Sequence, residues 1–253
     1  MKATLGLVFP PQCLGCGAGV AETGALCPDC WREAEFIGPC ACGRCGVPLP
    51  GDATAAGEDE AALLCDGCMT VARPWRRGRA ALVYAGTGRR LVLALKHGDR
   101  TDLAPALGQW LATAAAPLVR PGMIVVPVPL HPRRMLARKY NQAALLAERV
   151  ARVHGLRHLP GALVRTRHTP MQDHGSVDDR FANLDGALAV PPRARAALEG
   201  RAVLLVDDVM ASGATMAAAT DALRAAGSGP VAVAVLARAL RPEGAVVGKD
   251  GRG

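Results

Sequence analysis

The sequence has nothing long and apolar enough to cross a membrane. No hydrophobic run in its 253 residues approaches the roughly 20 residues of a transmembrane helix. The opening stretch MKATLGLVFPPQC has one lysine, a short apolar run broken by Pro10 and Pro11, and no small-residue cleavage site. It therefore lacks the features of a signal peptide, and we expect a mature protein in the cytoplasm.

Acidic residues are too few to balance the basic ones. The chain has 22 Asp and Glu residues against 30 Lys and Arg, so its formal net charge is +8. This excess favours anionic partners, which include phosphates, nucleic acid and membrane surfaces, and it selects none of them.

Cysteine is absent after residue 68, although nine cysteines precede that point. The odd count argues against a secreted disulfide framework. Eight of the nine form CxxC pairs. Each pair places two sulfurs on one tight turn, so two turns complete the tetrahedron that Zn²⁺ prefers. We predict two structural zinc ions, with the ligands Cys13, Cys16, Cys27, Cys30, Cys42, Cys45, Cys65 and Cys68.

The sequence leaves open how the CxxC pairs combine. Joining the first four cysteines and the last four is the simplest scheme, and a cross-braced scheme also fits. Cys40 is left over, either as a spare thiol or as a substitute for Cys42. Because the protein supplies every ligand, neither zinc keeps a position for catalysis. Two roles stay open: the ribbon only stabilises a small domain without a core of its own, or it also contacts nucleic acid or a partner protein.

The composition changes near residue 75, where strand-like and helix-like stretches begin to alternate. We expect strands at 80–85, 123–130, 162–166, 202–209 and 231–238. We expect helices at 88–96, 102–118, 141–154 (with Asn141 as N-cap), 178–184 and 214–227. The alternation predicts an α/β fold with a mostly parallel sheet flanked by helices. We divide the chain into a zinc ribbon domain (1–75), an α/β domain (76–242) and a flexible tail (243–253).

The stretch VLLVDDVMASGAT (203–215) predicts a ligand site. An apolar strand ends in Asp207 and Asp208, and a small-residue loop then leads into a helix. Ligands of open α/β sheets bind at this end of the strands, where backbone N–H groups at a helix N-terminus suit a phosphate. Two carboxylates would repel the phosphate, but they suit two neighbouring hydroxyls. The order of these features therefore indicates a binding site for ribose 5-phosphate.

The same stretch resembles the phosphoribosyl pyrophosphate (PRPP) signature of type I phosphoribosyltransferases. Four further stretches are similar to the ComF family, which joins a double zinc ribbon to a phosphoribosyltransferase-like domain. They are LKHGD (95–99), VPVPLHPRRMLARKYNQAALLA (126–147), RTRHTPMQ (165–172) and DDRFANL (178–184). The chain departs from the family at Ala211, where the family commonly has threonine.

The resemblance implies a role for each residue of the site. Asp207, Asp208 and Lys96 are the candidate catalytic residues: the two aspartates would hold the ribose hydroxyls, and Lys96 would lie in the pyrophosphate loop. Mg²⁺ would accompany PRPP. The implied phosphate contacts come from the loop Ala211, Ser212, Gly213, Ala214 and Thr215, and from a mobile flap with Arg133, Arg134 and Arg138.

The resemblance leaves three functions open. Because the ComF family is associated with natural transformation, the chain would bind PRPP or another ribose 5-phosphate ligand and handle incoming single-stranded DNA, with proteins of the competence machinery as partners. The alternatives are an active phosphoribosyltransferase and a PRPP-sensing regulator without turnover.

The linker RPWRRGR (73–79) is the candidate contact for DNA. Arginines with an interleaved aromatic suit phosphate contact and base stacking. The other interpretation is a basic linker whose tryptophan packs between the domains. The candidate residues are Arg73, Trp75, Arg76, Arg77 and Arg79.

Overall fold

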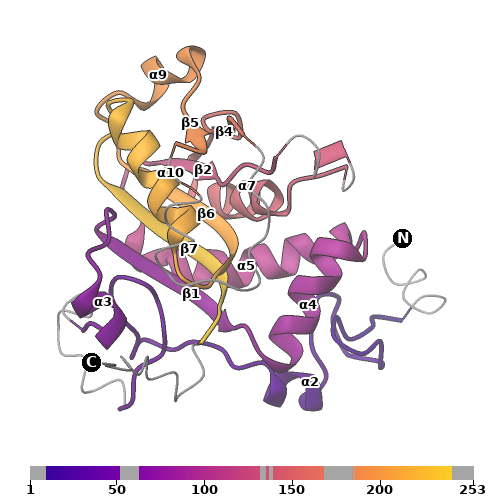
Figure 1. Ribbon diagram of the computed structural model, residues 1–253. Helices are drawn as coiled ribbons and strands as arrows, with labels where there is room; N and C mark the ends of the chain where they lie inside the picture. The colour runs from indigo at the N-terminus through magenta and orange to yellow at the C-terminus, as the bar shows by residue number, and fades with distance from the viewer. Residues whose placement is uncertain are drawn as a thin grey trace, which may run out of the picture.

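The computed structural model describes residues 10–51, 63–131, 135–136, 139–167, 184 and 186–240. Within them lies a five-stranded sheet in the order β1-β7-β6-β2-β3, and every neighbouring pair is parallel (Figure 1). Its strands are β1 (Arg77–Val83), β2 (Ile124–Pro127), β3 (Arg157–His158), β6 (Val203–Met210) and β7 (Val231–Arg238). Because the strands are parallel, all of them end at one edge of the sheet and begin at the other. We call these the carboxyl edge and the amino edge.

Helices cover both faces of the sheet, as its almost fully buried central strands require. One core packs strand residues such as Leu204 and Val206 against α4 (Gly86–His97), α5 (Ala104–Ala115) and α7 (Gln142–His154). The other packs Val203 and Leu205 against α9 (Pro192–Leu198) and α10 (Ala214–Ala225). From Val203 to Val206, odd and even residues of β6 therefore face different helices.

Two smaller elements complete the α/β part. An antiparallel pair joins β4 (Val164–Arg165) to β5 (Leu188–Ala189). Short 3-10 turns at Thr101–Leu103 and Ala116–Leu118 flank α5.

The cysteine-rich part has little regular structure. Its helices are one- to two-turn segments, α2 (Pro28–Glu33) and α3 (Asp66–Thr70). Between them the chain runs along the outer strand β1, where Ile37 N–H donates to the carbonyl of Ala81 and Val83 N–H donates to that of Glu35. This part adds backbone pairing to an otherwise open sheet edge.

The predicted α/β class is confirmed, with local differences. Asn141 caps α7 as predicted: its side chain accepts a hydrogen bond from Ala143 N–H at 3.0 Å. β1 begins at Arg77, earlier than predicted, because its polar first half pairs with β7. The single helix predicted at 102–118 divides into α5 and its two 3-10 turns. The helix predicted at 178–184 lies outside the described residues except for Leu184. No described helix has the length and hydropathy of a membrane span.

Candidate functional site

The two aspartates end β6 at the carboxyl edge, and they face opposite sides of the sheet. Side chains alternate along a strand, so Asp208 falls on the face of α4 and α7, and Asp207 falls on the other face. Asp208 is 4% exposed, whereas Asp207 is half-buried. Adjacent like charges are therefore separated by the pleat of the strand and lie in different surroundings.

Asp208 is fully engaged by its neighbours. Its Oδ1 lies 2.9 Å from Nζ of Lys96, at the end of α4, and its Oδ2 accepts a 2.6 Å hydrogen bond from Nε2 of Gln142, the first residue of α7. A buried carboxylate needs such partners, because desolvation disfavours its charge. Asp208 thus joins β6 to the two helices beside the site.

Asp207 is the more open carboxylate. Its Oδ1 accepts a 2.8 Å hydrogen bond from the backbone N–H of Asp208, and no described donor reaches its other oxygen. Burial and the neighbouring carboxylate of Asp208 raise the pKa of Asp207 to about 7. Of the two aspartates, Asp207 is the one with an oxygen available to a ligand hydroxyl or a cation.

The loop after β6 is held by its carbonyl groups. Arg238, the buried last residue of β7, donates to the carbonyls of Met210 at 2.8 Å and Ala211 at 2.7 Å. Arg73 donates to the carbonyl of Ser212 at 2.8 Å. Three successive carbonyls, of residues 210 to 212, therefore accept hydrogen bonds from arginine side chains.

The amide groups of the same loop are available. None of the described residues accepts a hydrogen bond from the amides of Ala211, Ser212, Gly213 or Thr215. Gly213 adopts a left-handed φ of 85° and precedes the first turn of α10. Successive free N–H groups at a helix N-terminus make a concave site for an anion. The geometry can hold one phosphate beside Asp207.

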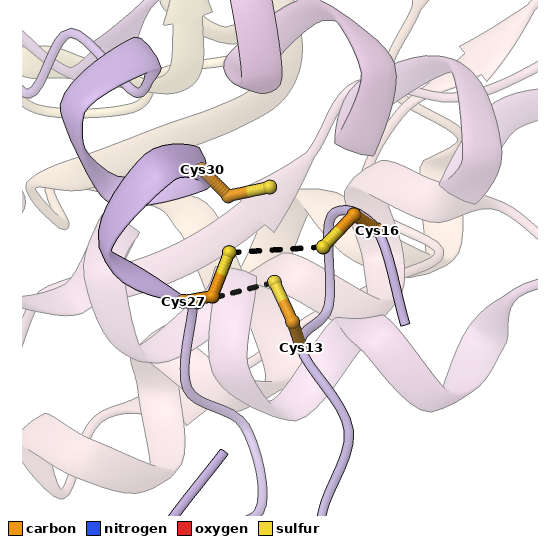
Figure 2. Close-up of side chains that lie close together, drawn as sticks. All are labelled: Cys13, Cys16, Cys27 and Cys30. Carbon is orange, nitrogen blue, oxygen red and sulfur yellow. Dashed lines mark hydrogen bonds between the residues drawn. The ribbon is translucent and has the colours of Figure 1, made fainter. Parts of the chain in front are cut away.

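The cysteines form two separate clusters, one from the first four and one from the last four. Figure 2 shows the first, in which Cys13, Cys16, Cys27 and Cys30 gather their sulfurs. In each cluster the four Sγ atoms lie within 4.8 Å of one another. Zn–S bonds of about 2.3 Å give a tetrahedron with sulfur–sulfur edges of about 3.8 Å. The Sγ atoms of Cys16 and Cys27 lie 3.7 Å apart, and those of Cys45 and Cys65 are also 3.7 Å apart. The clusters therefore fit two structural zinc ions.

The clusters settle the pairing of the CxxC turns. The sequential scheme is correct, and the cross-braced scheme is not what the chain adopts. Cys42 belongs to the second cluster, whereas Cys40 stands apart and faces the carbonyl of Pro50 at 3.8 Å. The first knuckle requires its glycine, because a Cβ at Gly15 would lie 2.8 Å from Sγ of Cys30.

The two ribbons pack against different parts of the α/β domain. The first contacts α4, where Arg90 pairs with Glu33 at 2.8 Å and Thr87 donates to the same carboxylate at 3.0 Å. In the second, Arg44 and Trp75 exchange hydrogen bonds of 3.0 and 2.6 Å. A Cβ on Gly213 would lie 3.1 Å from the ring of Trp75. The second ribbon thus supports the back of the loop 211–215, which we call the phosphate loop.

Comparison with known proteins identifies the family. The double zinc ribbon domain matches residues 4–69, and the phosphoribosyl transferase domain matches residues 144–251. The DNA utilization protein YhgH of Escherichia coli K12 is 32% identical over 221 residues, which cover 85% of this chain and 91% of YhgH. Competence protein F of Haemophilus influenzae is 27% identical over 238 residues, 91% of this chain and 98% of that protein. The chain belongs to the ComF family.

The structure brings together most of the site residues that the ComF resemblance implied. Asp207, Asp208, Lys96 and the loop 211–215 meet at the carboxyl edge. Lys96 is paired with Asp208, so its expected contact with pyrophosphate stays a prediction. The flap residues Arg133, Arg134 and Arg138 lie outside the described residues.

The linker 73–79 does not present all five of its DNA candidates to solvent. Trp75 is 1% exposed and packs between the domains, which agrees with the second interpretation of the linker. Its ring therefore offers no face to a base. Arg79 is buried, and Arg73 holds the phosphate loop. Arg76 is exposed and Arg77 is half-buried, and their contact with DNA stays a prediction.

Two residues of the ComF site were missed from the sequence. Gln142 follows the cap of α7, and Arg238 ends the apolar run VAVAVLAR. A charge closing a buried strand was the available signal for Arg238. Nothing in the sequence placed Gln142 beside Asp208, because that contact depends on how α7 packs against β6.

Proposed function

We propose that this ComF-family chain binds PRPP, or a related ribose 5-phosphate ligand, at the carboxyl edge and takes part in handling single-stranded DNA during natural transformation. The observation that carries the ligand is the loop 211–215, whose amides have no described acceptor while its carbonyls are held from behind. Asp207 beside it supplies an acceptor for a ribose hydroxyl. The names of the relatives, DNA utilization protein and Competence protein F, support the DNA role.

Mg²⁺ is part of the proposal because PRPP is strongly anionic. Mg²⁺ is usually held by one or two carboxylates together with substrate phosphates. Asp207, with one oxygen that no described donor engages, fits that role. Bound there, Mg²⁺ would neutralise pyrophosphate charge. We place the protein in the cytoplasm, where cysteines remain reduced, since eight of its nine cysteines gather in zinc-type clusters.

Calorimetric titration of PRPP and Mg²⁺ into the zinc-loaded protein tests the ligand. We expect binding by the wild type and at least tenfold weaker binding by Asp207→Asn, which keeps the shape of the side chain and removes its charge. Glu199→Gln, an exposed carboxylate at the amino edge, is the matched control and should bind as the wild type does. A wild type that does not bind PRPP, or equal binding by Asp207→Asn, contradicts the proposal.

Pyrophosphate release separates the remaining alternatives. A transferase should release pyrophosphate from PRPP when a nitrogen base is supplied, whereas a PRPP-sensing regulator should bind without release. A panel of bases, assayed after binding has been established, distinguishes the two.

A further inference from the structure

The amino edge of the sheet carries a row of arginines. Because the five strands are parallel, the residues that begin them share this edge. Five strands at about 4.8 Å spacing give an edge about 19 Å long. Four of the strands have an arginine at their first residue or within the four residues before it. We call these residues the arginine row: Arg76 and Arg77 at β1, Arg201 before β6, Arg120 before β2, and Arg157 at β3.

Four of the five arginines in the row carry an exposed charge. Arg76, Arg120, Arg157 and Arg201 are exposed, and none of them forms an ion pair with a described residue. Arg120 donates to backbone carbonyls of its own turn, which hold the guanidinium and leave its charge in place. The edge segments 74–77, 117–123, 155–158, 199–203 and 226–231 contain one acidic residue, Glu199.

A hollow separates two members of the row. A cavity of about 150 Å³ lies between Arg157 and Arg201, with the turns at Gly122 and Gly155 on its wall. A Cβ at Gly122 would lie 3.5 Å from Nη1 of Arg201, so the guanidinium extends across that glycine. Two guanidinium groups beside a small hollow suit a phosphate, since arginine binds phosphate oxygens in a bidentate manner.

We propose that the arginine row binds the sugar–phosphate backbone of single-stranded DNA. This inference rests on the proposed DNA-handling function and names its surface. A line of exposed cations complements a polyanion with repeating charges. Trp75 is buried and cannot stack on a base, so this surface contacts phosphates without reading sequence. The row differs from the linker 73–79, of which only Arg76 and Arg77 belong to it.

The chemistry of the edge favours nucleic acid over an anionic membrane. Binding to a bilayer surface is strengthened by apolar side chains that enter the headgroup region. The exposed large hydrophobic residues of the described chain are Trp31, Met69, Met135, Leu136, Val153 and Leu240, and none of them lies in the edge segments.

Fluorescence anisotropy with a labelled 20-nucleotide thymidine oligomer tests the row. The zinc-loaded full chain is compared with the edge triple variant Arg120→Gln/Arg157→Gln/Arg201→Gln. We expect at least tenfold weaker binding in 50 mM salt. The slope of log affinity against log salt should fall by about two, which corresponds to three lost phosphate contacts at about 0.7 each.

Two controls keep the test specific. The triple variant Arg32→Gln/Arg89→Gln/Arg152→Gln removes the same charge from exposed arginines elsewhere, and it should bind the oligomer much as the wild type does. The edge variant should also bind PRPP like the wild type, which shows that its fold is intact. If it does not, the double variant Arg157→Gln/Arg201→Gln, which leaves the turn bonds of Arg120 in place, takes its place with a proportionally smaller effect.

The outcomes separate this inference from the function on which it rests. If the wild type fails to bind the oligomer at low salt, the proposed DNA role falls and the inference falls with it. If the wild type binds and both triple variants lose affinity equally, the DNA role stands and the arginine row is wrong. If the edge variant loses affinity only for vesicles of phosphatidylserine and phosphatidylcholine, the edge is a membrane surface and the inference is overturned.

Discussion

The two edges of the sheet handle charge in opposite ways. At the carboxyl edge the charges are partly or fully buried, and one aspartate is paired: Asp208 is 4% exposed and bonded to Lys96 and Gln142. At the amino edge, arginines such as Arg157 and Arg201 are exposed and lack described ion-pair partners. One parallel sheet therefore presents partly buried, hydrogen-bonded polar groups at one end and a line of open positive charge at the other.

The difference in burial predicts a difference in behaviour. Charges in a low-dielectric site interact strongly and respond little to salt, whereas exposed charges are screened within about 10 Å at 0.1 M salt. Changes at the carboxyl edge should therefore alter stability and small-ligand affinity. Changes at the amino edge should alter salt-dependent binding and leave stability nearly unchanged.

Removal of zinc should have the largest effect, and it should reach the loop after β6. Metal binding to structural sites of this kind contributes about 10–16 kcal/mol of apparent free energy per zinc. Chelation should therefore unfold the cysteine-rich part, and with it the support that Arg73 and Trp75 give to the phosphate loop. We expect faster hydrogen exchange in residues 10–51 and at the amides of Ala214 and Ala217, whose hydrogen bonds end on Ser212 and Gly213, with little change in residues 117–123 of the amino edge.

Arg73→Ala provides the control for the zinc experiment. It removes the hydrogen bond to the carbonyl of Ser212 while leaving all eight zinc ligands in place. Exchange should rise at the amides of Ala214 and Ala217 and stay slow in the ribbons. Unchanged exchange at the loop after chelation would show that the second ribbon does not support it.

Lys96→Met should have the next largest effect. The substitution keeps most of the side chain and leaves Asp208 buried without its cation. Breaking a fully buried ion pair costs about 3–5 kcal/mol, and because the Lys96 side chain is 20% exposed we expect a loss of roughly 2–3 kcal/mol. Urea denaturation measures it. Arg89→Met, an exposed residue on the same helix, should change stability by less than about 0.5 kcal/mol. Equal effects of the two variants would mean that the pair with Asp208 is not what stabilises this edge.

The carboxyl edge was more predictable from the sequence than the amino edge. The aspartates, the loop and the helix of the ligand site are contiguous in the chain, so their order alone indicated their placement at the end of a buried strand. The zinc ligands were equally accessible, because CxxC spacing is local. Their pairing was left open, since it depends on which turns meet in space.

Contacts between distant segments were not predictable. Asp208 with Gln142, and Ser212 with Arg73, join residues 66 and 139 positions apart. The arginine row was not predictable for the same reason. Arg120, Arg157 and Arg201 are far apart in the sequence, and only the order of the parallel strands aligns them. The linker arginines were predicted as DNA contacts because they are close together in the sequence. Two of them have other positions: Arg79 is buried, and Arg73 donates to the carbonyl of Ser212.

The effect of Asp207→Asn on stability should depend on pH. The pKa of Asp207 is raised to about 7, above the value of about 3.9 expected in the unfolded chain. The folded state therefore keeps a proton that the unfolded state releases, so this group's contribution is full below about pH 4 and is lost as the pH rises toward 7. Asp207→Asn removes that loss. Its stability relative to the wild type, measured by urea denaturation, should be greater at pH 8 than at pH 5. Glu199→Gln, an exposed carboxylate at the amino edge, should show the same difference from the wild type at both pH values. A pH-independent effect of Asp207→Asn would mean that burial at the carboxyl edge does not set the charge of this aspartate, and the contrast between the two edges would lose its basis.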